Sequence, residues 1–161
     1  MSATFGDDAF ERQFEHLFGV AMRPASRILR SVEAAEDVAA EVLARAYADW
    51  KRLGGQPWLE AWITRVATNL SIDHVRKAKR RLPQVHVADT GQLELRMDLA
   101  SAVARLPKRQ REAVSLRYFG DLSEQEVAAL MQVSVGSVKT HVHRGLASIR
   151  LELGDGWEPA W

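Results

Sequence analysis

The chain of 161 residues contains no cysteine, so disulfide bonds, thiolate chemistry and cysteine-based zinc sites are excluded. No apolar run approaches the roughly 20 residues of a membrane-spanning helix, and the first residues lack the basic-then-apolar order of a signal peptide. A glycine-rich phosphate loop, a metal-spaced cluster and a nucleophile elbow are also missing. These absences favour a cytoplasmic protein that is not an enzyme, does not insert into a membrane and needs no metal or cofactor.

The charge of the chain is small in total but unevenly spread. The net charge is +1, and apolar residues make up 47%, which is enough for hydrophobic cores. Residues 31–49 carry five acidic side chains and one basic, residues 65–82 carry six basic and one acidic, and residues 105–150 carry eight basic and four acidic. Basic blocks favour a polyanion as partner, and an acidic helix favours a basic surface. Solvated helix faces are the alternative for each block taken alone.

Helical periodicity runs through almost the whole sequence, which predicts an all-α fold. Pro24 predicts a break or kink early in the chain, and Gly54-Gly55-Gln56-Pro57 predicts a clear break. Beyond an N-terminal helix and the acidic helix, helices are expected over residues 58–81, 93–106, 108–119, 122–131 and 134–153.

The segment LPQVHVADTGQ, residues 82–92, has no sustained period and predicts a linker between two small helical domains. Fully extended, its 11 residues reach at most about 40 Å. We expect a first domain over residues 7–82, the linker over 83–92, a second domain over 93–153 and a tail over 154–161. For Trp157 and Trp161 in the tail, docking on the body, binding of a regulator and disorder all stay open.

The second domain carries a helix-turn-helix pattern in DLSEQEVAALMQVSVGSVKTHV. Ser123 and Glu126 predict a capping box, and Ser134 predicts the cap of the following helix. At 100° per residue, that helix has one apolar stripe and one outward face of short polar and cationic groups. The apolar stripe consists of Val135, Val138, Val142, Leu146 and Ile149, and the outward face of Ser137, Lys139, Thr140, His141, His143 and Arg144.

This outward face is suited to the major groove of a DNA duplex, where it would contact bases and phosphates. A solvated face of an ordinary amphipathic helix is the alternative. His141 and His143 point about 160° apart on the helix, so they do not predict a shared metal site.

The first domain ends in PWLEAWITRVATNLSIDHVRKAKRR, a helix with tryptophans, a polar middle and a basic end. Aromatic rings beside Asn69 and cations are suited to unstacked bases of single-stranded DNA. As an alternative, Trp58 and Trp62 belong to the core, and Asn69 and Asp73 only cap and brace. The basic run over residues 76–81 is suited to phosphates.

Two stretches resemble the extracytoplasmic-function sigma factors. AEDVAAEVLARAY followed by WLEAWITRVATNLSIDHVRK is similar to sigma region 2, and residues 106–150 are similar to sigma region 4. The resemblance implies an RNA polymerase subunit with a region 2 helical bundle and a region 4 helix-turn-helix, which directs core polymerase to promoters. It implies promoter DNA and the clamp helices and flap region of polymerase as partners, an anti-sigma factor as a further candidate partner, and a location at the nucleoid.

The resemblance also implies three sets of site residues. The minus-thirty-five duplex would be bound by Arg117, Ser137, Lys139, Thr140, His141, His143 and Arg144. The minus-ten single strand would be bound by Trp62, Arg65, Asn69, Asp73, Arg76, Lys77 and Arg80. Core polymerase would be bound by Asp37, Ala40, Glu41, Leu43 and Arg45.

The chain departs from the family pattern at several positions. Ala40 and Leu43 stand where the family usually has Gln and Phe, and His141 stands where an arginine is common. Gln132 stands in the turn where a glycine is usual, so it either adopts a strained backbone conformation or gives the turn another shape. The linker is also short for the family.

Two other functions are compatible with parts of the sequence. A stand-alone helix-turn-helix regulator explains residues 133–150 but leaves residues 35–81 without a role. A sigma-like protein that binds polymerase or an anti-sigma factor without initiating transcription would account for the changes at Ala40 and Leu43.

Overall fold

The computed structural model describes residues 4–81, 91–154 and 156–157. In these parts of the chain every regular element is a helix, which confirms the predicted all-α class. The elements are α1 (Thr4–Ile28), α2 (Val32–Ala48), α3 (Trp50–Leu53), α4 (Leu59–Arg81), α5 (Gly91–Arg105), α6 (Lys108–Val114), the π-helix η1 (Ser115–Phe119), α7 (Glu124–Met131) and α8 (Val135–Leu153). The predicted linker lies outside the described residues except for its last two, which begin α5.

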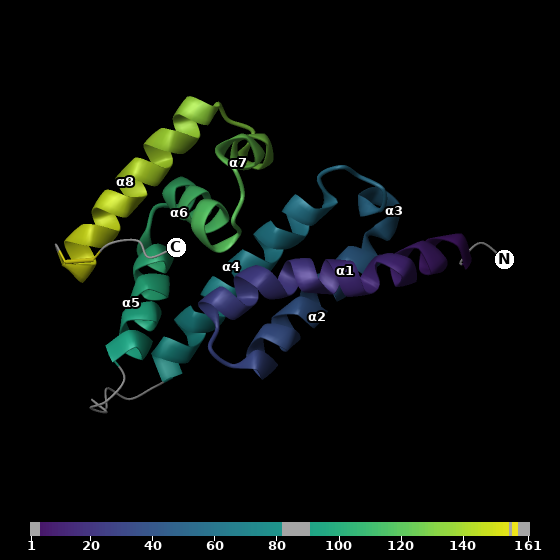
Figure 1. Ribbon diagram of the computed structural model, residues 1–161, viewed down its shortest axis with the longest axis horizontal. Coiled ribbons are helices and arrows are strands. Elements are labelled where there is room, and N and C mark those ends of the chain that lie inside the picture. Colours follow the sequence, from purple (N-terminus) through teal and green to yellow (C-terminus); the bar gives the residue numbers. More distant parts are fainter. Residues whose placement is uncertain (1–3, 82–90, 155, 158–161) are drawn as a thin grey trace.

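The N-terminal module, residues 4–81, is a bundle in which α1 packs against both α2 and α4 (Figure 1). Its core contains fully buried side chains such as Leu17, Leu53 and Ile63. Phe10 packs its ring 5.1 Å from Tyr47 and 5.0 Å from Trp50 between centroids, which ties α1 to the end of α2 and to α3. Burial of apolar side chains along α1 therefore stabilises the positions of α2 and α3 against it.

The predicted break or kink at Pro24 does not end the first helix, because α1 continues through Pro24 to Ile28. Proline removes one helical hydrogen bond. On either side of it, Ala21, Ala25 and Ile28 are buried, and the N–H of Leu29 donates to the oxygen of Ala25 at 2.7 Å. Packing of these buried side chains on the core compensates for the hydrogen bond that Pro24 cannot donate.

The C-terminal module, residues 91–157, packs α8 across α5, α6 and α7. A small core of Leu116, Val127, Met131 and Val138 lies beneath the helix-turn-helix. Gly145 of α8 allows a close approach to α6, because a Cβ atom there would lie 2.7 Å from the side chain of Val114.

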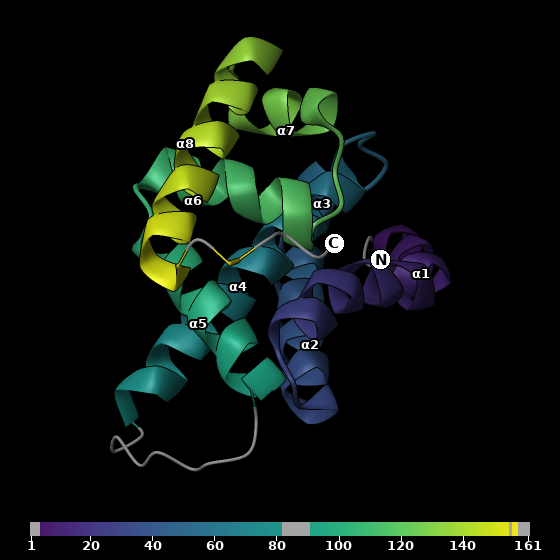
Figure 2. The same ribbon diagram turned by 60° about the vertical axis from the view of Figure 1, so that its left-hand side comes forward.

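The two modules are docked on each other, with α5 and η1 lying against α4 (Figures 1 and 2). Buried side chains of both modules belong to one continuous apolar cluster, which includes Ile72 of α4 and Val103 of α5. The tail adds Trp157, which is 6% exposed, to the same cluster. Docking on the body, binding of a regulator and disorder were open for the tail, and Trp157 is docked on the body. Trp161 lies outside the described residues.

Candidate nucleic-acid interface

The first helix of the helix-turn-helix begins with the predicted capping box. The hydroxyl of Ser123 accepts from the N–H of Glu126 at 3.2 Å, and the Glu126 carboxylate accepts from the N–H of Ser123 at 2.7 Å. Hydrogen bonds from the backbone and the hydroxyl of Ser123 lower the pKa of Glu126. The carboxylate is therefore ionised at neutral pH. Its negative charge also interacts favourably with the positive end of the α7 helix dipole.

The turn between α7 and α8 depends on a left-handed residue. Gln132 has φ 55° and ψ 47°, and the next residue, Val133, donates its N–H to the oxygen of Ala128 at 3.1 Å. The strained conformation, one of the two alternatives for this position, is thus the one adopted. Ser134 then caps α8 by accepting from the N–H of Ser137 at 3.1 Å, as predicted.

Helix α8 has the two faces that its periodicity predicts. Val138 and Ile149 on the inner stripe are fully buried. On the outward face, four side chains are exposed, and Ser137 and His141 are partly buried. The four exposed side chains are Lys139, Thr140, His143 and Arg144.

Several outward side chains have short-range partners that hold them in place. The Thr140 hydroxyl donates to the oxygen of Gly136 at 3.0 Å, and the hydroxyls of Ser134 and Ser137 lie 2.9 Å apart. The Lys139 ammonium lies 3.7 Å from the Glu124 carboxylate. Among the residues that the structure describes, none forms an ion pair or hydrogen bond with the Arg144 guanidinium, and the side chain is exposed on this face.

Arg117, which the resemblance placed with the duplex-binding residues, lies on η1 and is half-buried. Its guanidinium donates to the oxygen of Leu122 at 3.2 Å and lies 5.9 Å from the ring centroid of Tyr118. In this conformation Arg117 braces the loop before α7.

The predicted single-strand residues form two groups along α4. In the outer half, Asn69, Asp73, Arg76, Lys77 and Arg80 are exposed, and Arg76 lies 3.9 Å from Asp73. In the inner half, Trp62 is half-buried against the core, and Arg65 contacts the C-terminal module.

The predicted polymerase-binding residues lie on α2, and one differs from the rest. Asp37, Ala40, Glu41 and Arg45 are exposed on one side of the helix, with Glu41 paired to Arg45. Leu43 is only 2% exposed. Its side chain is part of the core, so this position contributes to packing and not to the exposed surface of α2.

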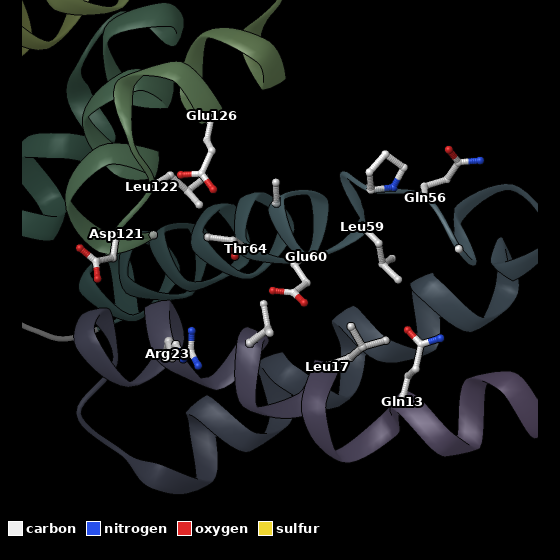
Figure 3. Close-up of a pocket in the computed structure, with 15 residues that line it drawn as sticks. Gln13, Leu17, Arg23, Gln56, Leu59, Glu60, Thr64, Asp121, Leu122 and Glu126 are labelled. Carbon is white, nitrogen blue, oxygen red and sulfur yellow. The ribbon is translucent and has the colours of Figure 1, made fainter.

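An open cleft of about 610 Å³ lies between α1, α4 and the segment from η1 to α7 (Figure 3). Arg23 of α1, Glu60 of α4 and Asp121 after η1 are among the residues that line it, together with the apolar side chain of Leu17 (Figure 3). Among the described residues, no group of three His, Asp or Glu side chains is placed to hold a metal ion. None of the described helices is long and apolar enough to cross a membrane.

Sequence reasoning missed three residues at the junction of the modules, namely Arg27, Glu112 and Asp121. They form ion pairs between α1 and the segment after η1, and between α4 and α6. They lack a motif, and their pairing depends on a docking geometry that periodicity does not contain.

Comparison with known families matches both modules. The model of Sigma-70 region 2 matches residues 14–81, and the model of Sigma-70, region 4 matches residues 96–149. Together they cover α2 and α4 with their candidate surfaces and the whole helix-turn-helix.

Individual proteins agree with the family models. The ECF RNA polymerase sigma factor SigW of Bacillus subtilis is 31% identical over 153 residues, covering 80% of each chain. The RNA polymerase sigma-E factor of Streptomyces antibioticus is 34% identical over 126 residues, covering 74% of this chain and 70% of its own. Among solved structures, CnrH in complex with the cytosolic domain of CnrY is similar in fold, with a TM-score of 0.60 at 22% identity, over 94% of this chain and 91% of its own. The sigma factor RpoE in complex with the anti-sigma factor NepR from Bartonella quintana has a TM-score of 0.56 at 23% identity, over 89% and 96%.

Proposed function

The chain belongs to the extracytoplasmic-function sigma factors of RNA polymerase, and from this premise we propose how its surfaces divide promoter recognition. As a sigma factor it directs core polymerase to promoters and initiates transcription. The match to region 2 removes the stand-alone regulator as an explanation of the chain.

The outward face of α8 reads the minus-thirty-five element as duplex. The observation that carries this proposal is the exposed set Lys139, Thr140, His143 and Arg144 on a helix that is capped at Ser134 and packed along its other side. An α-helix fits the major groove, where arginine and lysine donate to guanine and to phosphates. Ser137 and His141 flank this set, while Arg117 acts from η1 on the loop before α7.

The outer half of α4 holds the minus-ten element as single strand. Asn69 and Asp73 present amide and carboxylate groups to base edges, and Arg76, Lys77 and Arg80 hold phosphates. Trp62 and Arg65 extend this face toward the start of the helix. Their partial burial means that they become fully available only when neighbouring elements move.

The acidic side of α2 binds core polymerase. Asp37, Ala40, Glu41 and Arg45 form an exposed, mainly acidic surface that suits basic groups on the clamp helices. Leu43 supports this surface from beneath. The C-terminal module adds the contact to the flap region.

The module boundaries of the proposal are residues 7–82 and 93–153, joined by the linker over 83–92 and followed by the tail over 154–161. The protein has no catalytic activity of its own, because the polymerase supplies the chemistry. We place it in the cytoplasm, with polymerase at the nucleoid. Since one protein of similar fold is the sigma factor RpoE in complex with the anti-sigma factor NepR, an anti-sigma factor is a further proposed partner.

Directed cleavage of promoter DNA tests this division. The natural chain has no cysteine, so a single cysteine at Thr140 or Asn69 carries an iron chelate at a unique position. In the complex with core polymerase, cleavage from position 140 is expected around minus thirty-five on both strands. Cleavage from position 69 is expected around minus ten, where the strands separate. Exchange of the two patterns, or cleavage by neither, would overturn the assignment.

A further inference from the structure

Thr140 lies in the middle of the outward face of α8. It is the sixth residue of the helix, and its side chain is exposed. At 100° per residue it points about 160° away from Val138, which is fully buried. The N-terminal part of a recognition helix is the part that contacts base edges. In the duplex complex proposed above, Thr140 therefore faces the floor of the major groove.

The hydroxyl group of Thr140 is already engaged within the helix. It donates to the backbone oxygen of Gly136, one turn earlier, at 3.0 Å. A hydroxyl has a single proton to donate, so this one has no proton left for an acceptor on a base. The same hydrogen bond selects one χ1 rotamer of the branched side chain, which also fixes the direction of the methyl group. The methyl group is thus the part of the Thr140 side chain that is free to contact DNA.

Open space lies next to Thr140 at Gly136. The two residues are four apart, so they point within about 40° of each other on the outward face. Gly136 is exposed, and a Cβ atom there would meet the hydroxyl oxygen of Ser134 at 3.8 Å, an ordinary van der Waals distance. The helix surface therefore has room for one more carbon atom beside Thr140.

Two polar side chains near Thr140 are held by other partners. The Ser137 hydroxyl lies 2.9 Å from the hydroxyl of Ser134. The Lys139 ammonium lies 3.7 Å from the carboxylate of Glu124. Both groups are therefore engaged inside the helix-turn-helix, and they leave the surface at Thr140 and Gly136 open to an apolar contact.

The chemistry of this surface favours one base. In the major groove, thymine presents a methyl group, and the methyl group of threonine makes an apolar contact with it. Guanine presents acceptors there, which need the proton that Thr140 gives to Gly136. Adenine and cytosine present an amino group, which the hydroxyl oxygen could still accept, and the experiment below separates this alternative.

We propose that Thr140 and Gly136 together form a contact site for the 5-methyl group of one thymine in the minus-thirty-five element. The methyl group of Thr140, and not its hydroxyl, sets the base preference at that position. Gly136 leaves the space that the thymine methyl group occupies. The proposal rests on the function proposed above for α8.

The test uses the holoenzyme of the full chain with core polymerase. The probe is a promoter fragment that the natural holoenzyme selects from a random pool. Each thymine of its minus-thirty-five element, on either strand, is replaced in turn by deoxyuridine, which removes only the methyl group. Replacement at one position is expected to lower affinity about fourfold, which corresponds to the loss of one buried methyl group.

Three variants separate the methyl group, the hydroxyl group and the open space. Thr140→Ser keeps the hydroxyl without the methyl group, Thr140→Val keeps a methyl group without the hydroxyl, and Gly136→Ala fills the space. Thr140→Ser and Gly136→Ala are expected to bind the thymine and deoxyuridine fragments within about twofold of each other, whereas Thr140→Val keeps the fourfold difference. The matched control is Gly19→Ala, at an exposed position of α1 where a Cβ atom meets nothing within 4 Å, and it should also keep the difference.

The proposal is overturned if Thr140→Ser keeps the preference for thymine, or if Thr140→Val loses it, because the hydroxyl would then be the reading group. Selected promoters without an invariant thymine in the element overturn it as well. Arg144→Ala shows whether the function of α8 fails too, by comparison of the promoter with a copy whose minus-thirty-five segment is scrambled. A reduced ratio of these two affinities, without any effect of deoxyuridine, means that α8 reads the element and only the thymine contact is wrong. An unchanged ratio in both Arg144→Ala and Thr140→Ser refutes the function of α8 itself.

Discussion

At the scale of single residues, Gln132 has a strained backbone conformation that the turn of the helix-turn-helix requires. Its φ of 55° lies in the left-handed region, which glycine enters freely and other residues enter at a cost. The Val133 N–H bonds back to α7 across this turn and the side chain of Gln132 is exposed. This position therefore requires a residue that adopts the left-handed backbone conformation, and it places no packing requirement on the side chain.

Gln132→Gly is therefore expected to raise the free energy of unfolding by about 0.5–1 kcal/mol. The matched control is Gln125→Gly, which places the same change inside α7 and is expected to lower stability by about 1 kcal/mol. Denaturant unfolding of the three proteins measures both effects. A loss of stability in Gln132→Gly equal to that in Gln125→Gly would show that strain is absent from the turn.

At the scale of helices, the capping box before α7 gives a stability that depends on pH. The pKa of Glu126 is lower in the folded chain than its ordinary value of 4.5, because Ser123 donates to the carboxylate. A lowered pKa means that the stabilisation is fully present above 4.5 and is lost as the pH falls through the folded value.

The stability difference between the natural chain and Glu126→Gln is thus expected to be largest near neutral pH and to vanish in acid. Unfolding by urea between about pH 7 and about pH 3 measures it. Glu36→Gln, at an exposed position of α2, is the control. Its stability difference from the natural chain should change less with pH. A constant difference for Glu126→Gln across this range would contradict the role of the charge.

Local sequence signals predicted most of the helices and much of the candidate site. The capping box, the cap at Ser134, the inner stripe of α8 and the extent of α4 all follow from residue types at helical spacing. Two features escaped because they depend on tertiary contacts. Leu43 was assigned to a binding surface although packing buries it, and the break that was one of the two expectations at Pro24 is absent, because α1 continues through it.

At the scale of the whole molecule, the docking of the modules could not be read from the sequence. Periodicity identifies an apolar face but not which of several apolar faces covers it. The pairing of Arg65 with Glu112 joins residues 47 positions apart, and neither belongs to a motif that names its partner. The tail posed the same difficulty, since nothing local distinguishes a docked tryptophan from a free one.

Trp157 is expected to stabilise the docked molecule, because it is 6% exposed and belongs to the cluster shared by both modules. Trp157→Ala should lower the free energy of unfolding by about 2–3 kcal/mol, less than for a central tryptophan because a chain end can relax. Thermal unfolding of the variant measures the loss. Trp58→Ala, at a position that is 39% exposed, should cost less, and equal costs would contradict the docking of the tail.

The division of promoter recognition between two helices is the central claim, and one measurement separates their roles. Holoenzymes with Arg144→Ala or Asn69→Ala are compared on one promoter, for binding by filter retention and for strand opening by permanganate reactivity of thymines. The exposed positions Arg150 of α8 and His74 of α4 provide matched alanine controls.

Arg144→Ala is expected to weaken promoter binding by about 1–3 kcal/mol, because the arginine acts in duplex recognition. Asn69→Ala should leave binding within about twofold and reduce the opened fraction several-fold, because the amide acts on separated strands. A binding defect in Asn69→Ala with normal opening, together with unchanged binding in Arg144→Ala, would contradict the account.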